Sequence, residues 1–107
     1  METLIFEFPA SQTLSHRAHV GVVGSGDLEI LFDPSIDAKT TVSIRTGSTG
    51  FQETWEKVLG RFFSQNDVAA TIKINDFGAT PGVVSMRLAQ ALEVSQNGSQ
   101  DTEAKLR

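Results

Sequence analysis

The segment Gly24-Ser25-Gly26-Asp27 places one serine between two glycines, where two apolar strand-like runs meet. Glycine lacks a Cβ and adopts positive φ, so this segment presents the Ser25 hydroxyl without a neighbouring side chain to shield it. Such a hydroxyl can act as a nucleophile of its own protein, or it can be the group that another protein modifies.

A catalytic serine needs a base within hydrogen-bond reach and a third group that orients the base. His19 and Asp27 are the candidates, but the six residues of chain from His19 to Ser25 span roughly 20 Å as a strand. The nucleophile-elbow pattern G-x-S-x-G is also unmatched, because Val23 and Asp27 occupy its outer positions. We therefore expect that the chain is not an enzyme by itself.

Gly24–Asp27 also has the composition of an ordinary hairpin turn, for which Gly, Ser and Asp are common residues. A turn needs only one glycine with one Asp or Asn, whereas Gly21, Gly24 and Gly26 all surround Ser25. Repeated glycine indicates close approach by another surface. Phosphate binding is disfavoured, because the segment lacks a Gly-Lys-Ser/Thr ending and precedes a strand instead of a helix.

A second dense loop, Asp76–Gly82, precedes a helical pattern. Thr80 followed by Pro81 predicts an N-cap with proline at the first helical position. A helix N-terminus behind a glycine can receive an anion, but a strand-to-helix turn with Phe77 filling the core explains the same residues. If both glycine loops lie on one side of the sheet, they form a shared docking surface.

The elements that must position these loops follow from apolar periodicity. Alternation of apolar and polar residues predicts strands at about 4–8, 18–23, 28–32, 40–46 and 70–74. Helical spacing predicts a helix of roughly four turns over about 50–64, with Phe51, Trp55 and Phe62 in the core. A second helix begins at Pro81 and ends near Val94.

This order, β-β-β-β-α-β-α, predicts an α+β fold with a single two-layer domain. We expect a mostly antiparallel sheet of about five strands that is covered by two helices. Residues 1–94 form the domain, and residues 95–107 are a polar C-terminal tail that we expect to fray. The strand order cannot be read from the sequence.

Composition narrows the function classes. A net charge of −4 argues against a nucleic-acid partner, because no basic patch is present. The absence of cysteine excludes disulfides and thiolate catalysis, and His16 and His19 with scattered carboxylates give no metal-ligand set. No apolar run approaches the roughly 18 residues of a membrane span, and Met1-Glu2-Thr3 lacks a signal-peptide pattern. We expect a cytoplasmic protein without membrane insertion.

Four segments of the chain resemble the delta subunits of bacterial malonate decarboxylase, which are acyl carrier proteins. These segments are Met1–Leu4, Phe6–Ala10, Val20–Glu29 and Asp76–Val84. The Val-Gly-Ser-Gly-Asp-Leu-Glu and Asp-Phe-Gly-Ala-Thr-Pro-Gly blocks, in this order, are the most specific part. The resemblance extends over about residues 1–94, with only a loose match at 34–66.

The resemblance implies that Ser25 is joined through a phosphodiester to 2'-(5''-phosphoribosyl)-3'-dephospho-CoA, whose thiol carries acetyl and malonyl groups. Gly24, Gly26 and Asp27 are the expected loop that presents Ser25. We expect Asp27 either to orient the serine or to position the donor through a metal held by the transferase. The implied partners are a phosphoribosyl-dephospho-CoA transferase, a malonyl transferase, and the acyl transferase (alpha) and decarboxylase (beta, gamma) subunits. The alternatives are a citrate lyase-type acyl carrier with the same group, and a docking module with no prosthetic group.

Overall fold

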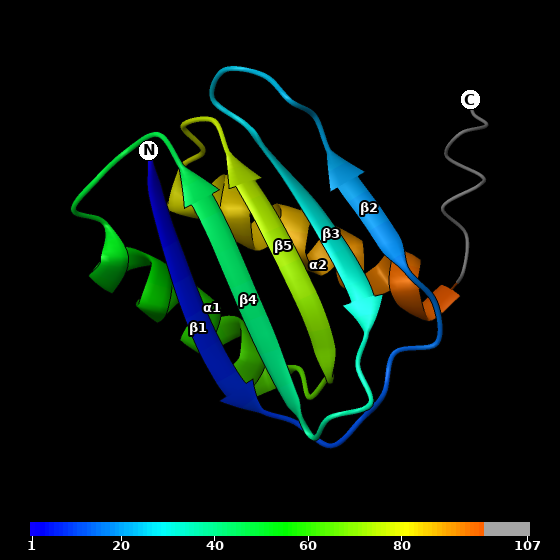
Figure 1. Cartoon of the computed structure of the whole chain (residues 1–107). Helices are drawn as coiled ribbons and strands as arrows, with labels where there is room; N and C mark the ends of the chain where they lie inside the picture. Colours follow the sequence, from blue (N-terminus) through cyan, green and yellow to red (C-terminus); the bar gives the residue numbers. More distant parts are fainter. Residues whose placement is uncertain (98–107) are drawn as a thin grey trace, which may run out of the picture.

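The computed structural model describes residues 1–97 and contains one five-stranded sheet and two helices, in the predicted order (Figure 1). The elements are β1 (Glu2–Pro9), β2 (Ala18–Gly21), β3 (Leu28–Pro34), β4 (Lys39–Thr46), α1 (Gln52–Gln65), β5 (Ala70–Asp76) and α2 (Pro81–Asn97). The strand order is β1-β4-β5-β3-β2. Only the β4–β5 pair is parallel, so the prediction of a mostly antiparallel α+β sheet is confirmed.

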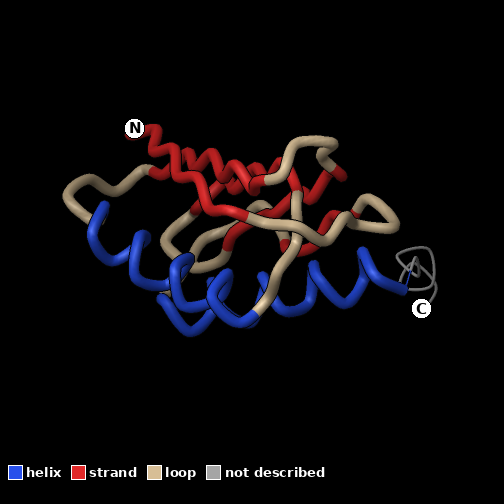
Figure 2. Tube along the Cα trace, turned by 90° about the horizontal axis from the view of Figure 1, so that it is seen from below, coloured by secondary structure: helices blue, strands red, loops and turns tan. Residues whose placement is uncertain are grey.

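The sheet and the helices form two layers, with both helices on one face of the sheet (Figure 2). Alternate strand residues point toward the helices and are fully buried, for example Ile30, Ile44 and Ile72. Their neighbours along the strands lie on the open face and are exposed, as Lys73 is, or half-buried, as Leu31 is. This alternation follows from the period of two along a strand. Neither helix in residues 1–97 is long and apolar enough to cross a membrane.

The predicted apolar stripe of α1 is correct except at its first member. Trp55 and Leu59 are buried, and Phe62 is partly buried against the core. Phe51 is 51% exposed, contrary to prediction. It occupies the N-cap with φ −109° and ψ 20°, so its side chain leaves the backbone outside the helical spiral. The helical period therefore does not apply to it.

The strand before the Ser25 turn is shorter than predicted. β2 ends at Gly21, which has φ +92°, and Val22, inside the predicted strand, lies outside β2 and is 57% exposed. A Cβ built on Gly21 would lie 2.0 Å from the Leu28 carbonyl oxygen. The chain therefore turns out of the sheet at a position that requires glycine.

Helix α2 is longer than predicted and ends at Asn97 instead of near Val94. Ser95 continues the buried stripe of Leu88 and Ala91. Its hydroxyl donates to the Leu92 carbonyl at 2.7 Å, and its carbonyl accepts the His16 amide at 3.1 Å. A serine satisfied by its own helix can be buried, which an apolar pattern does not reveal. The rest of the predicted tail, from residue 98, lies outside the described residues.

Candidate functional site

The turn that carries Ser25 spans residues 22–27, between β2 and β3 at the upper end of the sheet in Figure 1. The Asp27 amide donates to the Gly24 carbonyl at 3.2 Å, which closes a turn with Ser25 and Gly26 at its centre. Gly26 has φ +79°, the value that a type II turn requires at its third residue. The predicted Gly24–Asp27 turn is therefore confirmed, and Ser25 at its tip is exposed.

The two glycines beside Ser25 are open to solvent on their side-chain faces. A Cβ built on Gly24 or Gly26 would have no heavy atom of residues 1–97 within 4 Å, apart from its chain neighbours. Gly26 needs positive φ, whereas Gly24 has an ordinary φ. Within the described chain, neither space nor backbone conformation requires glycine at position 24. The surface around the hydroxyl is thus free for the approach of another molecule.

The base of the turn is fixed against the loop that follows β5. The Gly26 amide donates to the Phe77 carbonyl at 2.8 Å, and the Phe77 amide donates to the Asp27 carbonyl at 2.9 Å. These bonds extend the pairing of β3 with β5 beyond Leu28 and Asp76. The two glycine loops therefore lie side by side at one end of the sheet, as the shared-surface hypothesis requires.

The Asp27 side chain is held by α2. Arg87 donates through Nε to Asp27 Oδ1 at 3.1 Å and through Nη2 to Oδ2 at 2.6 Å, and the Leu28 amide donates to Oδ1 at 2.7 Å. The Arg87 and Leu28 hydrogen bonds hold the pKa of the Asp27 carboxyl below its usual range. The side chains of Arg87 and Asp27 are only 20% and 19% exposed. The carboxylate is thus committed to the base of the turn.

The side chain of Asp76 accepts hydrogen bonds from the amides of the loop that follows β5. Asp76 Oδ1 accepts the Gly78 amide at 3.2 Å and the Ala79 amide at 2.9 Å, while the Thr46 hydroxyl donates to Oδ2 at 2.8 Å. Thr80 caps α2 as predicted, since its Oγ1 accepts the Val83 amide at 3.2 Å. An external anion would have to displace Asp76 from these amides.

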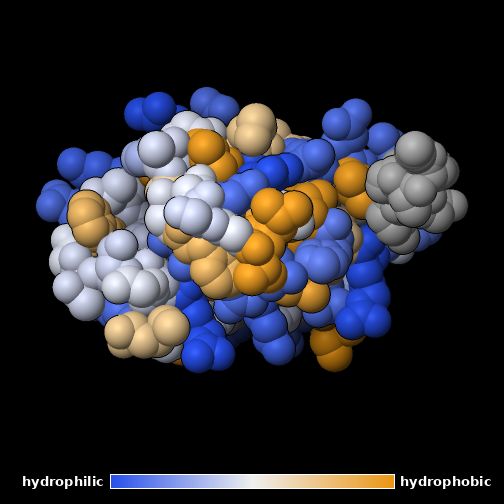
Figure 3. Space-filling model, turned by 90° about the horizontal axis from the view of Figure 1, so that it is seen from above, coloured by the Kyte–Doolittle hydropathy of each residue, from blue (hydrophilic) through white to orange (hydrophobic). Residues whose placement is uncertain are grey.

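Phe77 in the same loop does not fill the core, contrary to prediction, and is 38% exposed. Its backbone pairs with the Ser25 turn on the line of β5, so its side chain follows the strand alternation after the buried Asp76 and points away from the helices. Together with Val22 and Val23, at 57% and 68% exposure, it adds apolar surface at this end of the molecule. Figure 3, which looks onto this end, shows apolar side chains gathered on the surface.

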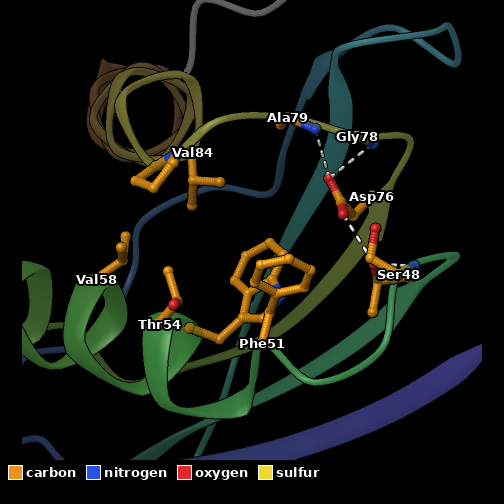
Figure 4. A pocket seen from close by; sticks show the side chains of 11 residues that line it. Ser48, Phe51, Thr54, Val58, Asp76, Gly78, Ala79 and Val84 are labelled. Atoms are coloured by element: carbon orange, nitrogen blue, oxygen red, sulfur yellow. Dashed lines mark hydrogen bonds between the residues drawn. The ribbon is translucent and has the colours of Figure 1, made fainter.

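A pocket of about 430 Å³ opens beside these loops, between the N-termini of the two helices and the ends of β4 and β5 (Figure 4). Helix α1 contributes Thr54, Trp55 and Val58, and α2 contributes Val84. Phe51, the residue misplaced by the sequence prediction, also lines it. In Figure 4 the Thr54, Val58 and Val84 side chains converge on the same space. The pocket is mainly apolar.

The histidines do not contribute to the Ser25 turn. His19 Nε2 lies 2.8 Å from Glu29 Oε2 across the β2–β3 pair, and it is 56% exposed on the open face of the sheet. His16 is exposed in the connection before β2. Both histidines therefore lie on solvated surfaces. In residues 1–97 no three His, Asp or Glu side chains are placed to hold a metal ion.

Sequence reasoning missed two residues that shape this site, Arg87 and Asp76. Arg87 is the single charged residue between Asp76 and Glu93, and such an isolated charge inside an apolar helix signals a specific partner. Asp76 ends a strand two residues before a glycine, which is the spacing of an Asx turn. Neither signal identifies the partner residue.

Comparison with known proteins gives relatives over nearly the whole domain. The family model described as malonate decarboxylase delta subunit (MdcD) matches residues 15–95. The malonate decarboxylase acyl carrier protein of Pseudomonas fluorescens (strain Pf0-1) is 48% identical over 94 residues, which cover 87% of this chain and 95% of that protein. The corresponding protein of Azotobacter vinelandii is 48% identical over 98 residues, covering 91% of this chain and 99% of its own.

A solved structure gives the same relationship. One chain of a Pseudomonas malonate decarboxylase hetero-tetramer in complex with malonate matches with a TM-score of 0.83 and 48% sequence identity. The match covers 87% of this chain and 97% of that chain. The fold and the sequence therefore indicate the same family.

Proposed function

This chain belongs to the malonate decarboxylase delta-subunit family, and from that premise we propose that it carries acyl groups on a prosthetic group attached to Ser25. Its relatives are acyl carrier proteins, and the chain is a non-catalytic acyl carrier subunit of malonate decarboxylase. The finer proposal is that the group is phosphoribosyl-dephospho-CoA, joined through a phosphodiester. The thiol of that group supplies the thioester chemistry.

One observation supports Ser25 as the attachment residue: an exposed hydroxyl stands on a turn with a fixed base and an open tip. Gly24 and Gly26 leave free space on both sides of Ser25. At the base, Asp27 is bound by Arg87 and the backbone is paired with Phe77. A transferase can enclose such a tip without unfolding the domain. The residues present therefore fit a bulky group joined through the serine oxygen.

Attachment forms a bond from Ser25 Oγ to a phosphorus of an activated donor and breaks the phosphoanhydride bond of that donor, so pyrophosphate leaves. The serine proton must leave to a base. Asp27 is occupied by Arg87 and the Leu28 amide, and His19 by Glu29. We infer that the transferase supplies this base, and any metal that balances the charge of the donor. In the same proposal Asp27 fixes the base of the turn instead of orienting the Ser25 hydroxyl.

The proposed partners follow from the carrier role. A related chain is part of a malonate decarboxylase hetero-tetramer. We propose that this chain likewise meets acyl transferase (alpha) and decarboxylase (beta, gamma) subunits, a malonyl transferase, and the phosphoribosyl-dephospho-CoA transferase that loads it. A tethered thioester reaches each active site at an effective concentration on the order of mM, so a small mobile carrier can serve several sites.

The test is the intact mass of the chain after co-expression with the candidate transferase genes, followed by peptide mapping. We expect a mass gain equal to the CoA-derived group on the peptide that contains Ser25. Ser25→Ala should abolish the gain while leaving the unfolding free energy, measured by urea titration, within about 0.5 kcal/mol of wild type. Ser48→Ala, in another exposed loop at the same end, is the matched control and should load normally.

An unmodified chain, with the transferase shown to be active on a known carrier, would overturn the proposal. The chain would then be a docking module with no prosthetic group. A gain that persists in Ser25→Ala would overturn the attachment site alone.

A further inference from the structure

We propose that the pocket between α1 and the N-terminus of α2 shelters the acyl-thioester end of the group carried on Ser25 between visits to partner subunits. This inference rests on the proposed function, since it takes the tethered acyl group as the occupant. The pocket belongs to the carrier itself, so it would act on every acyl group that the chain transports.

The position of the pocket relative to Ser25 favours this occupant. Gly78 and Ala79 line the pocket, and they belong to the loop whose Phe77 pairs with Gly26. A Cβ built on Gly78 would lie 3.7 Å from the Gly26 amide nitrogen, so the wall of the pocket touches the Ser25 turn. A fully extended polypeptide spans about 3.5 Å per residue, and the amide-linked units of the arm are at least as long. An arm of several such units therefore reaches over this wall.

The size and lining of the pocket suit a short thioester followed by amides. Its volume of about 430 Å³ falls within the range of small-molecule sites. Trp55, Val58 and Val84 supply an apolar wall, while Ser48 and Thr54 are exposed and offer hydroxyls near the rim. Asp76 also lines the pocket, but its carboxylate oxygens accept bonds from Gly78, Ala79 and Thr46, so it does not repel the arm as a free acceptor would.

Storage must be weak, because the arm has to leave for each partner. A tethered group has an effective concentration on the order of mM. A site with an intrinsic dissociation constant of about 1 mM is therefore filled roughly half of the time. Such a site lowers the exposure of the thioester to water without blocking its transfer.

The chain has a built-in reporter for this pocket. Trp55 is the single tryptophan of the sequence, it lines the pocket, and it is 6% exposed. We expect attachment of the acetyl-loaded group to change the emission of Trp55 and to lower its quenching by acrylamide. Ser25→Ala, treated with the same transferase, should show neither change, because it carries no group.

A variant that fills the pocket tests whether the acyl group is sheltered there, independently of whether the prosthetic group is attached. Thr54→Phe places a ring at the exposed edge of the pocket, and Glu56→Phe places the same ring on an exposed α1 residue that does not line it. Both should gain the full mass of the group. With the acetyl thioester in place, we expect hydroxylamine to cleave it about twofold faster in Thr54→Phe than in wild type or Glu56→Phe, since a half-occupied site halves the exposure of the thioester.

Equal rates of thioester cleavage in loaded wild type and Thr54→Phe, with unchanged Trp55 emission, would overturn the inference and leave the proposed function intact. A missing mass gain would instead overturn the proposed function. In that case the pocket is tested on the unloaded chain with free S-acetyl-pantetheine by NMR. Binding at about 1–10 mM should shift the Thr54 and Ala79 amides but not Glu56, and no shift would overturn the inference.

Discussion

The Ser25 turn and the Asp76–Thr80 loop lie side by side at one end of the sheet, yet they are held in different ways. The loop is organised from within, because Asp76 accepts two of its amides and Thr80 caps the helix that follows. The tip of the turn has open space at both glycines. Among residues 1–97, the contacts that hold it lie at its base, where Gly26 and Asp27 pair with Phe77 and Arg87 binds the Asp27 carboxylate.

This difference separates residues that the fold requires from residues that the fold leaves exposed to another protein. In the loop, the polar side chains of Asp76 and Thr80 each have hydrogen-bond partners that explain the residue type. At the tip, Gly24 and Ser25 have residue types that the fold itself does not require. A residue that folding leaves free but that stands exposed on a fixed base is a candidate for recognition by another protein.

The largest effect on stability is expected at the base of the turn. Gly21→Ala places a Cβ 2.0 Å from the Leu28 carbonyl oxygen at φ +92°. Backbone strain of this kind contributes about 1–3 kcal/mol, and the clash adds to it. Urea unfolding should show the loss, and Gly47→Ala, with no atom within 4 Å, is the control. A fully stable Gly21→Ala would mean that the base is as free as the tip.

The next effect tests the neighbouring loop. Asp76→Ala leaves the Gly78 and Ala79 amides and the Thr46 hydroxyl without their acceptor. We expect a loss of about 1–3 kcal/mol in unfolding free energy. Asp37→Ala, which removes an exposed carboxylate from another loop, should change it by less than about 0.5 kcal/mol. Equal values for the two variants would show that the loop is not organised by Asp76.

A smaller effect distinguishes the two glycines of the tip. Gly26→Ala forces an alanine to φ +79° and should lower stability by about 1 kcal/mol. Gly24→Ala should change stability by less than about 0.5 kcal/mol, but should slow attachment of the prosthetic group because its Cβ lies beside the serine. Time courses of intact mass, at equal folded fraction, measure the second effect. Normal loading of Gly24→Ala would remove the argument that glycine 24 serves a partner.

The smallest effect is a change in the acid dependence of stability. Arg87 and the Leu28 amide lower the pKa of Asp27 in the folded state. Their contribution is complete above the unfolded pKa of about 3.9 and is lost as pH falls through the lower folded pKa. Arg87→Met should therefore be less stable than wild type at neutral pH and lose less stability below about pH 4.

Urea midpoints measured across this pH range test the prediction. Some acid dependence should remain in Arg87→Met, because hydrogen bonds from Asn75 and His19 lower the pKa of Glu29, and those from Ser11 lower the pKa of Asp67. Parallel curves for wild type and variant would show that the Asp27–Arg87 pair does not contribute. Asp27 raises the pKa of Arg87. The titration of Arg87 itself therefore changes the stability of the protein only at strongly alkaline pH.

Much of the fold was predictable because its signals are local. Alternation at Val42 and Ile44 predicted β4, and Thr80-Pro81 predicted the start of α2. Two of the failures lie where the apolar pattern continues past the end of an element. Phe51 has the spacing of the α1 stripe but lies at its N-cap, and Val22 continues the alternation of β2 after the chain has left the sheet at Gly21.

The candidate site was predictable only in part. The Gly24–Asp27 turn and the capped loop were found from residue types, since glycine conformations and capping act within a few residues. The Asp27–Arg87 pair joins residues 60 apart, and no local signal specifies such a partner. The pocket is likewise built from α1, α2 and the ends of β4 and β5.

The sequence by itself determined the order of elements, the faces they bury and the serine placed at an open turn. These depend on side-chain period and on backbone preferences, which each segment carries alone. The tertiary structure decided the order β1-β4-β5-β3-β2, the contact of the Ser25 turn with the Phe77 loop and the pocket beside them. Strand pairing and helix packing are contacts between distant segments, so they exist only once the whole domain has assembled.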